Sequence, residues 1–478
     1  MRSRLNKDLS WLAYNARILQ EARDNTVPLL QRKEFLEFFR LNLEKFKRKR
    51  LEKFSNKIEK ASSEKERKQL TKLASDIENT IVHHQHEFDI ISQQLISSIT
   101  QEDTVFSYQP IPSVYHQDLT PFENYFEVLN KKDVLLYYPY HSFDHVIKLL
   151  DCASVDPGVK EINITIFRAA RGSIVIHCLK VAAQNGKRIR CFLEPKARDD
   201  EAKIEYIERE LDSPNIQLFE GNPDYKIHSK ALLIKRVTEE GHKCYSYLST
   251  GNFNEKNAKI YTDLGLMTSD DHIGEDLESM FDYMENKCKH LKFYKLVMSP
   301  FSLREKLLKL IKKETKIARK GEKAFIHAKM NSLEDKKVIE KLYEASQAGV
   351  EIKLLVRGVC CLKAGVQGLS ENIQVYSIID RFLEHSRIFI FGNGGDELTY
   401  ASSADWMKRN FDNRFELMFP IEDKEIKKEV LTILDFYFKD NAKTRVADTE
   451  YKNQYKIDGN KEFHAQIQLH NFFKEKAK

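Results

Sequence analysis

The middle of the chain and its C-terminal half carry the same landmarks in the same order. In each copy a strand-like segment is followed by a glycine-closed helical segment, a histidine with a cation two residues later, and a small-residue turn ending in Asn or Asp. The matched pairs are Arg168 and Lys329, Gly186 and Gly349, His228 and His385, and Asn252 and Asp405, at offsets of 161, 163, 157 and 153 residues. This spacing indicates an internal duplication, so one fold unit is expected twice.

Both copies have the sequence pattern of an α/β unit. Short β-branched runs such as EINITIF at 161–167 and KALLIK at 230–235 alternate with segments of helical periodicity. This alternation is typical of sheets covered by helices. We therefore predict two tandem α/β domains, at residues 111–290 and 291–478.

Residues 1–110 have a different pattern. Leu, Ile and Phe recur at spacings of three and four between charged stretches, and glycines are few, which predicts amphipathic helices. The stretch SYQPIPSVYHQDLTP then concentrates prolines and breaks the helical period. A helical N-terminal domain is expected to end there.

Composition limits the cellular setting. No stretch approaches 18 uncharged apolar residues, and the first residues lack the apolar core and cleavage site of a secretory signal. The seven cysteines form no CxxC pair, which favours reduced thiols over disulfides or zinc. These features predict a cytoplasmic protein without a transmembrane segment.

The charge is modestly basic and unevenly distributed. The formal charge is +6, from 78 Lys and Arg against 72 Asp and Glu, which suits anionic ligands without identifying one. Residues 45–53, KFKRKRLEK, hold six cations and one anion in a helical pattern. Such a run is commonly a solvated helix face, and the alternative is a surface that attracts anions.

The repeated histidines suggest phosphoryl chemistry. On a strand, residues i and i+2 face the same side, so His228 is expected beside Lys230 and His385 beside Arg387. Pairing of the two halves would bring both histidines to one cleft, where one attacks phosphorus and the other handles the oxygen partner. The cations would hold phosphate oxygens. A lone strand histidine is usually structural, but the matched recurrence favours a chemical role.

The motifs resemble those of the polyphosphate kinase family of the first type, whose catalytic core consists of two phospholipase-D-like domains. The matching strings are RLNKDLSWLAYNARILQEA, NLEKF, YYPYHSFDHV, KIHSKALL, STGNFNEKNAKIYTDLGL, AKMNSLED, LLVRGVCCLKAGVQGLSENI, RFLEHSRIF and SSADWMKRNFDNRFE. They cover the helical start and most of the chain from about residue 119 to 420.

The resemblance implies roles for particular residues. His228 matches the phosphorylated histidine and His385 the second histidine, a general acid or base that also contacts ATP. The other implied ATP contacts are Asn42, Tyr261 and Arg357. Arg168 and Arg198 match positions linked to phosphate and magnesium; because a guanidinium has no lone pair for a metal, we expect them to clamp the phosphates that hold Mg²⁺. Supporting positions are Lys230, Asn252, Arg387, Arg414 and Glu416.

The implied activity is reversible transfer of the ATP γ-phosphate to inorganic polyphosphate through a phosphohistidine, with Mg²⁺ as cofactor. ATP, ADP and polyphosphate would be the partners, and nucleic acid would not. Family members carry a further domain between the helical start and the core, which contributes to dimer contacts; here the proline-rich linker stands in its place, which leaves a homo-oligomer open. The family's ARFDE motif is ARDDE at 197–201, which adds a carboxylate beside Arg198.

Two alternative functions stay open. A phospholipase-D-type phosphodiesterase would share the fold, but its HxK signature has an Asp five residues after the lysine, where this chain has Lys235 and, in the second copy, Gly392. A non-catalytic protein that binds polyphosphate or nucleotide is the other alternative. Retention of both histidines with Arg168, Arg198 and Arg357 favours the kinase.

Overall fold

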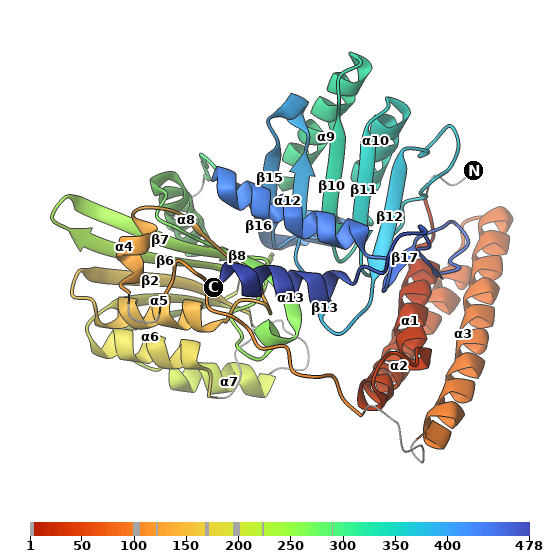
Figure 1. Cartoon of the computed structure of the whole chain (residues 1–478), viewed down its shortest axis with the longest axis horizontal. Helices are drawn as coiled ribbons and strands as arrows, with labels where there is room; N and C mark the ends of the chain where they lie inside the picture. The colour runs from red at the N-terminus through yellow and green to blue at the C-terminus, as the bar shows by residue number, and fades with distance from the viewer. Residues whose placement is uncertain are drawn as a thin grey trace.

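The computed structural model describes residues 4–98, 106–120, 123–167, 172–194, 201–221, 224–288 and 290–478. A helical N-terminal domain is followed by two α/β domains, which confirms the predicted fold class (Figure 1). Among the described helices, none is both long and apolar enough to cross a membrane.

The N-terminal domain is a bundle of α1 (Lys7–Arg23), α2 (Leu29–Glu59) and α3 (Glu64–Ser98). Asn6 caps α1 by accepting hydrogen bonds from the backbone N–H groups of Asp8 and Leu9, at 2.8 and 3.1 Å. One apolar stripe from each helix forms the core, where Leu12, Phe39 and Ile77 are fully buried. Ile379 of the second α/β domain packs into the same core, so the bundle is docked onto that domain.

The first α/β domain is built on a sheet whose strands run in the order β1-β8-β7-β6-β2-β3-β4. Successive residues of β1 face opposite sides: Val134, Leu136 and Tyr138 join the core beneath α5 and α6, whereas Leu135 and Tyr137 face the second domain. The elements are α4 (Tyr125–Leu129), β1 (Val134–Tyr138), α5 (Asp144–Val155), β2 (Val159–Ile166), α6 (Ile174–Gln184), β3 (Arg188–Leu193), α7 (Glu201–Glu210), β4 (Ile216–Glu220), β5 (Lys226–Ile227), β6 (Ala231–Thr238), β7 (Gly241–Ser249), β8 (Tyr261–Thr268) and α8 (Asp271–Met284).

The second α/β domain repeats this topology. Its strands run β9-β16-β15-β14-β10-β11-β12, and β17 and β18 extend the sheet beyond β12. The elements are β9 (Val297–Ser299), α9 (Leu303–Arg319), β10 (Phe325–Met330), α10 (Lys336–Gln347), β11 (Glu351–Val356), β12 (Ile373–Ile378), β13 (Leu383–Glu384), β14 (Ile388–Phe391), β15 (Leu398–Ser402), α11 (Lys408–Asn413), β16 (Arg414–Ile421), α12 (Lys424–Lys439), β17 (Thr444–Val446), β18 (Gln454–Tyr455) and α13 (Ala465–Lys476).

The duplication extends to details of both copies. Three parallel strands (β2, β3, β4 and β10, β11, β12) are followed in each by an antiparallel strand, β6 beside β2 and β14 beside β10. The helix after the last shared strand begins at an Asp cap in both copies, Asp270 for α8 and Asp423 for α12. One fold unit therefore occurs twice, as the repeated landmarks predicted.

The two domains exchange short strands. β5 of the first domain pairs with β16 of the second, and β13 of the second pairs with β8 of the first. A continuous apolar core lies between the domains and includes residues of α8, α12 and α13. The exchanged strands are the segments that lead into His228 and His385, so the fold brings both histidines to the interface.

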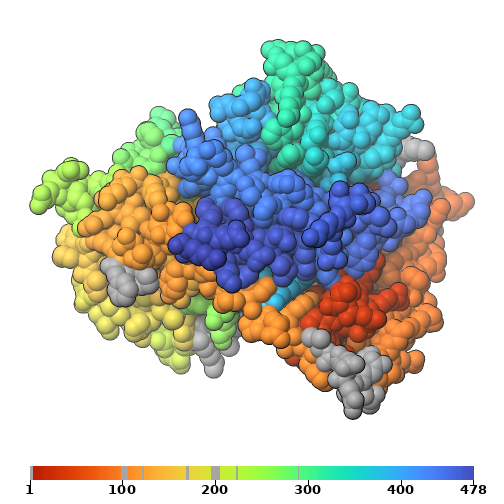
Figure 2. Space-filling view, in the orientation of Figure 1, coloured from red at the N-terminus to blue at the C-terminus, as the bar shows by residue number. Residues whose placement is uncertain are grey.

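The C-terminal segment contacts both the first α/β domain and the N-terminal bundle (Figures 1 and 2). After β17 and β18, α13 crosses to the first α/β domain, where the ring of Phe473 lies 5.7 Å from Tyr140 and 4.6 Å from His141. Closer to the N-terminal bundle, Lys443 forms ion pairs with Glu21 and Asp24 of the α1 end, at 2.8 and 2.7 Å.

Candidate active site

His228 is held by the other copy of the repeat. It follows β5 directly, and its Nδ1 lies 2.8 Å from Oε2 of Glu416, on β16. The backbone N–H groups of His228 and Ser229 both donate to the carbonyl oxygen of Phe415, at 2.9 and 2.8 Å. With Glu416 ionised, Nδ1 carries the ring proton, and Nε2 keeps its lone pair for an electrophile.

Glu416 is fully buried and saturated with hydrogen bonds. Ser403 Oγ donates to Oε2 at 2.6 Å, Asn410 Nδ2 donates to Oε1, and Arg414 Nη1 lies 3.6 Å from Oε1. Burial raises the pKa of Glu416, and the nearby charges of Lys230 and Arg414 oppose that rise. The carboxylate is fixed in position before any substrate arrives.

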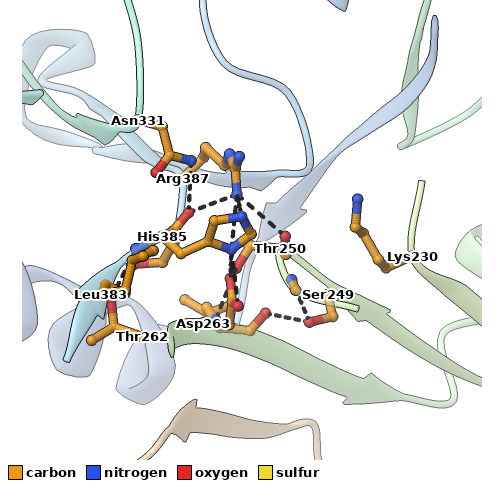
Figure 3. Close-up of polar contacts among 12 residues, drawn as sticks. Lys230, Ser249, Thr250, Thr262, Asp263, Asn331, Leu383, His385 and Arg387 are labelled. Carbon is orange, nitrogen blue, oxygen red and sulfur yellow. Dashed lines mark hydrogen bonds and ion pairs between the residues drawn. The ribbon is translucent and has the colours of Figure 1, made fainter. Parts of the chain in front are cut away.

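His385 has the same arrangement with the roles of the copies reversed. Its Nδ1 lies 2.8 Å from Oδ1 of Asp263, on β8, and Thr250 Oγ1 donates to that oxygen at 2.6 Å. Figure 3 shows the imidazole between Asp263 and the guanidinium of Arg387, whose Nη1 is 3.1 Å from Nε2. Arg387 is also held by Asp405, at 3.3 Å from Nε to Oδ1.

The two sites are related residue by residue. Asp263 and Glu416 are 153 residues apart, as are Thr250 and Ser403, and as are Asn252 and Asp405. Each histidine is therefore oriented by a carboxylate from the other copy. The hydroxyl that donates to this carboxylate comes from the same copy as the carboxylate. Sequence reasoning named Glu416 without a definite role and missed Asp263, although the 153-residue offset applied to Glu416 points to it.

The expectation that each histidine and its cation share one strand is wrong. Residues 228–230 lie between β5 and β6, and residues 385–387 lie between β13 and β14. At each histidine the chain leaves a short strand that pairs with the other domain, β5 or β13, and then enters a strand of its own domain's sheet, β6 or β14. Lys230 Nζ accordingly donates to the backbone oxygen of His228, whereas Arg387 does contact the ring of His385.

Burial keeps both imidazoles neutral. Burial, with the charges of Lys230 and Arg414, holds the pKa of His228 well below its usual range. Burial and then Arg387 lower the pKa of His385 to about 4. Burial also lowers the pKa of Lys230 to about 7. Protonation of His385 would also disfavour protonation of His228, which places both histidines in one electrostatic environment.

A basic cavity opens beside this centre, between the helical bundle and the second α/β domain. It has a volume of about 620 Å³ and is lined by Asn42 and Arg357. Arg357 is clamped by Asn331 Oδ1, at 2.8 Å from Nη2, and by the hydroxyl of Tyr14, at 2.8 Å from Nη1. Asn331 Nδ2 in turn donates to the backbone oxygen of His385 at 3.3 Å. The cavity thus begins at the residues that surround His385.

Of the other expected site residues, Tyr261 is described by the structure, whereas Arg168 and Arg198 are not. The ring of Tyr261 lies 5.3 Å from the ring of His385, on the side of the first α/β domain. Arg168 and Arg198, with the added carboxylate Asp199, lie outside the described residues. Lys235, at the position of the phosphodiesterase Asp, is on β6 and pairs with Glu278.

Comparison with known proteins agrees with this architecture. The polyphosphate kinase N-terminal domain matches residues 4–109, C-terminal domain 1 matches 124–290, and C-terminal domain 2 matches 296–466. This chain belongs to the polyphosphate kinase family. The segment where the resemblance places a further family domain holds only residues 110–123 here.

Two relatives and one solved structure show how similar this chain is to family members and how much of each protein the similarity covers. Polyphosphate kinases of Vibrio vulnificus (strain YJ016) and Yersinia pestis are 42% and 43% identical over 372 and 368 residues, covering 77% of this chain and 53% of each relative. The chain thus spans about half the length of these relatives. The crystal structure of polyphosphate kinase from Porphyromonas gingivalis superposes with a TM-score of 0.89 at 25% identity and covers 99% of both chains.

Proposed function

We propose that this chain catalyses reversible transfer of the γ-phosphoryl group of ATP to the end of inorganic polyphosphate, through a phosphohistidine at His228. The observation that carries the proposal is the reciprocal pair of histidine–carboxylate contacts, His228 with Glu416 and His385 with Asp263. One site with two oriented, neutral imidazoles suits a two-step transfer between two phosphate oxygens.

In the first step, Nε2 of His228 attacks the γ-phosphorus, a P–N bond forms, and the bond to the ADP oxygen breaks. The imidazole becomes cationic as it bonds, and Glu416 stabilises that charge through Nδ1. In the second step, a terminal oxygen of polyphosphate attacks the phosphorus and the P–N bond breaks, which returns neutral His228. His385 is placed to exchange a proton with the oxygen that leaves or enters.

The cations of the site supply the remaining stabilisation. Arg387 and Arg414 lie near the histidines, together with Lys230, whose lowered pKa of about 7 leaves it partly charged at neutral pH. Arg357 faces the cavity where we place the nucleotide. The described residues include no cluster of three or more side chains that could hold a metal ion, and both active-site carboxylates are already bonded. Mg²⁺ therefore fits as an ion carried by the nucleotide phosphates, where it would neutralise part of their charge.

The test is phosphoryl labelling. Incubation with γ-labelled ATP should give an acid-labile, base-stable protein adduct that chases into polyphosphate or back to ATP when polyphosphate or ADP is added. His228→Ala should abolish the label, whereas His327→Ala, on β10 and paired with Glu351, should retain it. A label that survives His228→Ala would contradict His228 as the nucleophile, whereas no label in the unaltered protein would favour a binding protein.

A further inference from the structure

A buried ion pair lies directly behind His385. Lys329 of β10 and Glu384 of β13 are 1% and 3% exposed, and Nζ lies 2.9 Å from Oε2. The ammonium of Lys329 also donates to Ser386 Oγ at 2.6 Å and to Thr262 Oγ1 at 3.2 Å. Because an ammonium has three N–H groups, Lys329 has a partner for each of them.

The partners of Lys329 adjoin both members of the His385–Asp263 contact. Glu384 and Ser386 flank His385 in the sequence, and the residue before Asp263 is Thr262. Thr262 Oγ1 accepts from the backbone N–H of His385 at 3.2 Å (Figure 3) and donates to Glu384 Oε2 at 2.8 Å. One buried cation therefore joins the segment of His385 to the segment of Asp263. We call the following residues the His385 network: Lys329, Glu384, Thr262 and Ser386.

The first copy of the repeat has a neutral residue where the second has Lys329. The strand registers of β2 with β6 and of β10 with β14 place Thr165 at the position of Lys329, so the expected match with Arg168 is wrong. Thr165 Oγ1 donates to the backbone oxygen of Ser229 at 2.8 Å and accepts from the backbone N–H of Ala231 at 3.0 Å. Neutral hydrogen bonds thus anchor the segment after the first histidine.

The exchanged strands differ between the copies in the same way. Glu384 of β13 lies opposite Thr262 of β8. The matched pair in the first copy is Ile227 of β5 opposite Phe415 of β16, and both of these side chains are buried. The same fold is therefore built once with an ion pair and once with apolar side chains at this place.

A buried ion pair adds little stability by itself. Removing two charges from water costs about as much as their attraction returns, and apolar side chains of similar volume often serve as well. The first copy demonstrates this, since its matched positions carry no charge. The ion pair therefore has a role specific to the second copy, and what it contacts there is the backbone on both sides of His385.

The C-terminal helix completes the His385 network. Gln466, in the first turn of α13, donates from Nε2 to Glu384 Oε1 at 2.6 Å and to the backbone oxygen of Phe382 at 2.8 Å. Its Oε1 accepts from the backbone N–H of Phe382 at 2.9 Å. Both oxygens of Glu384 therefore have partners, and α13 fixes its position together with Lys329.

We propose that Lys329, paired with Glu384, is a positioning residue that holds His385 against Asp263 for proton exchange with the phosphate oxygen. The inference rests on the proposed function for the step that His385 serves. It gives the two copies different tasks. His228, whose segment is anchored without charge, accepts the phosphoryl group, whereas His385 keeps one orientation while the oxygen partner changes.

The experiment uses the full chain with Lys329→Met and Glu384→Gln combined, because this double change keeps the side-chain volume and leaves no buried charge without a partner. The matched control is Lys476→Met with Glu429→Gln, which removes the ion pair between α13 and α12 by the same substitutions. Formation of the phosphohistidine label and its chase into polyphosphate are each measured in a single turnover. Both are repeated in combination with Asp263→Asn, and thermal melting checks that each variant is folded.

The double variant should slow the chase about tenfold and label formation less than about threefold, because misplacing a general acid or base affects the step that exchanges the proton. Combined with Asp263→Asn, it should add less than about twofold to the loss, since both changes act through His385. The control should stay within about twofold in every measurement, because its ion pair does not contact the His385 network.

Proton resonances provide an independent measurement. Each histidine has its Nδ1–H bonded to a carboxylate and should give a downfield signal, which Asp263→Asn shifts or removes for His385 and Glu416→Gln for His228. The double variant should weaken or remove the signal of His385 and leave that of His228. A merely structural role for the ion pair would not separate the two signals.

An unchanged chase, an unchanged His385 signal or equal slowing of label formation and chase would overturn the proposal, as would losses that multiply with Asp263→Asn. If the double variant does not melt cooperatively, Ser386→Ala decides, because it removes one acceptor of Lys329 and keeps both charges. It should slow the chase about threefold, and an unaffected chase would overturn the proposal. Failure of the proposed function is distinguishable, since the unaltered protein would then form no label while the His385 signal still reports on positioning.

Discussion

Glu416 lies 2.8 Å from the Nδ1 atom of His228 although the two residues belong to different copies of the duplicated unit. Asp263 and His385 repeat the relationship in the opposite direction. The reactivity of each imidazole therefore depends on a side chain that lies on a strand of the other domain.

Glu416→Gln should slow phosphorylation of His228 by about 100-fold or more, because the amide keeps the volume but cannot stabilise the imidazolium. Asp263→Asn should leave the first labelling step within about tenfold and slow the chase into polyphosphate more, because its histidine serves proton exchange. Single-turnover labelling followed by a chase separates the two effects. Equal loss of both steps in both variants would contradict separate roles for the two carboxylates.

Labelling of His228 should persist into mild acid. Since burial holds the pKa of His228 well below its usual range, the neutral nucleophile is retained when pH falls below 6.5. An unperturbed imidazole would be about three-quarters protonated at pH 6. The initial single-turnover rate with saturating magnesium should therefore fall less than about twofold between pH 7.5 and pH 6. A fourfold loss over that interval would indicate a solvent-like histidine.

Arg17 should control the affinity for nucleotide. It donates from α1 to the backbone oxygens of Arg357 and Gly358, at 3.1 and 3.0 Å, and to Oδ1 of Asn453 in the C-terminal segment, at 2.9 Å. Lysine cannot reach three acceptors in this fork geometry, so Arg17→Lys should raise the KM for ATP by about tenfold with kcat changed less than about threefold.

Asn453→Ala, which removes one end of the Arg17 contact, should shift the ATP KM in the same direction by a smaller factor. The control is Arg23→Lys, because Arg23 makes an exposed ion pair with Glu87 and should be silent. A fall in kcat at constant KM would contradict a positioning role for Arg17.

Acid should destabilise the junction of the linker and the first α/β domain. His145 accepts from the backbone N–H of His116 at 2.8 Å and contacts the hydroxyl of Tyr125 at 2.8 Å. Burial lowers the pKa of both His116 and His145 to about 4. The unfolded chain, with histidine pKa values near 6.5, then binds more protons between pH 6.5 and 4, so folding stability falls as the pH falls.

Each such histidine contributes up to about 1.4 kcal/mol per pH unit to that slope. Urea denaturation at pH 6.5, 5.5 and 5 should show a shallower loss of stability for His145→Gln than for the unaltered protein, from a lower starting value. Parallel slopes would show that His145 titrates normally in the fold.

Much of the architecture followed from the sequence because it is local. Hydrophobic periods predicted the helical bundle, the β-branched runs predicted the strands, and the repeated His-x-cation landmarks predicted a site made by both copies. His228, His385 and Arg357 were identified from motifs of the family, and in the structure all three belong to one electrostatic environment.

What the sequence did not predict depends on contacts between distant segments. Asp263 matters because β13 pairs with β8, and local sequence patterns do not reveal this pairing; the 153-residue offset from Glu416 was the signal that pointed to Asp263. Tyr14 and Arg17 lie on an ordinary amphipathic helix, and only docking of α1 on the second α/β domain brings them to Arg357. The strand assignment of His228 failed for a related reason, since its segment changes partner sheets at that residue.

The exchange of β5 and β13 has a consequence for the origin of the chain. In this arrangement each imidazole meets the acid of the other copy, so an unduplicated ancestral unit with the same contacts would have formed them between two identical chains. After gene fusion the two copies could diverge, which accounts for an Asp at position 263 and a Glu at the matching position 416. Separating the two halves should remove the His228 label from each, and mixing the halves should restore it.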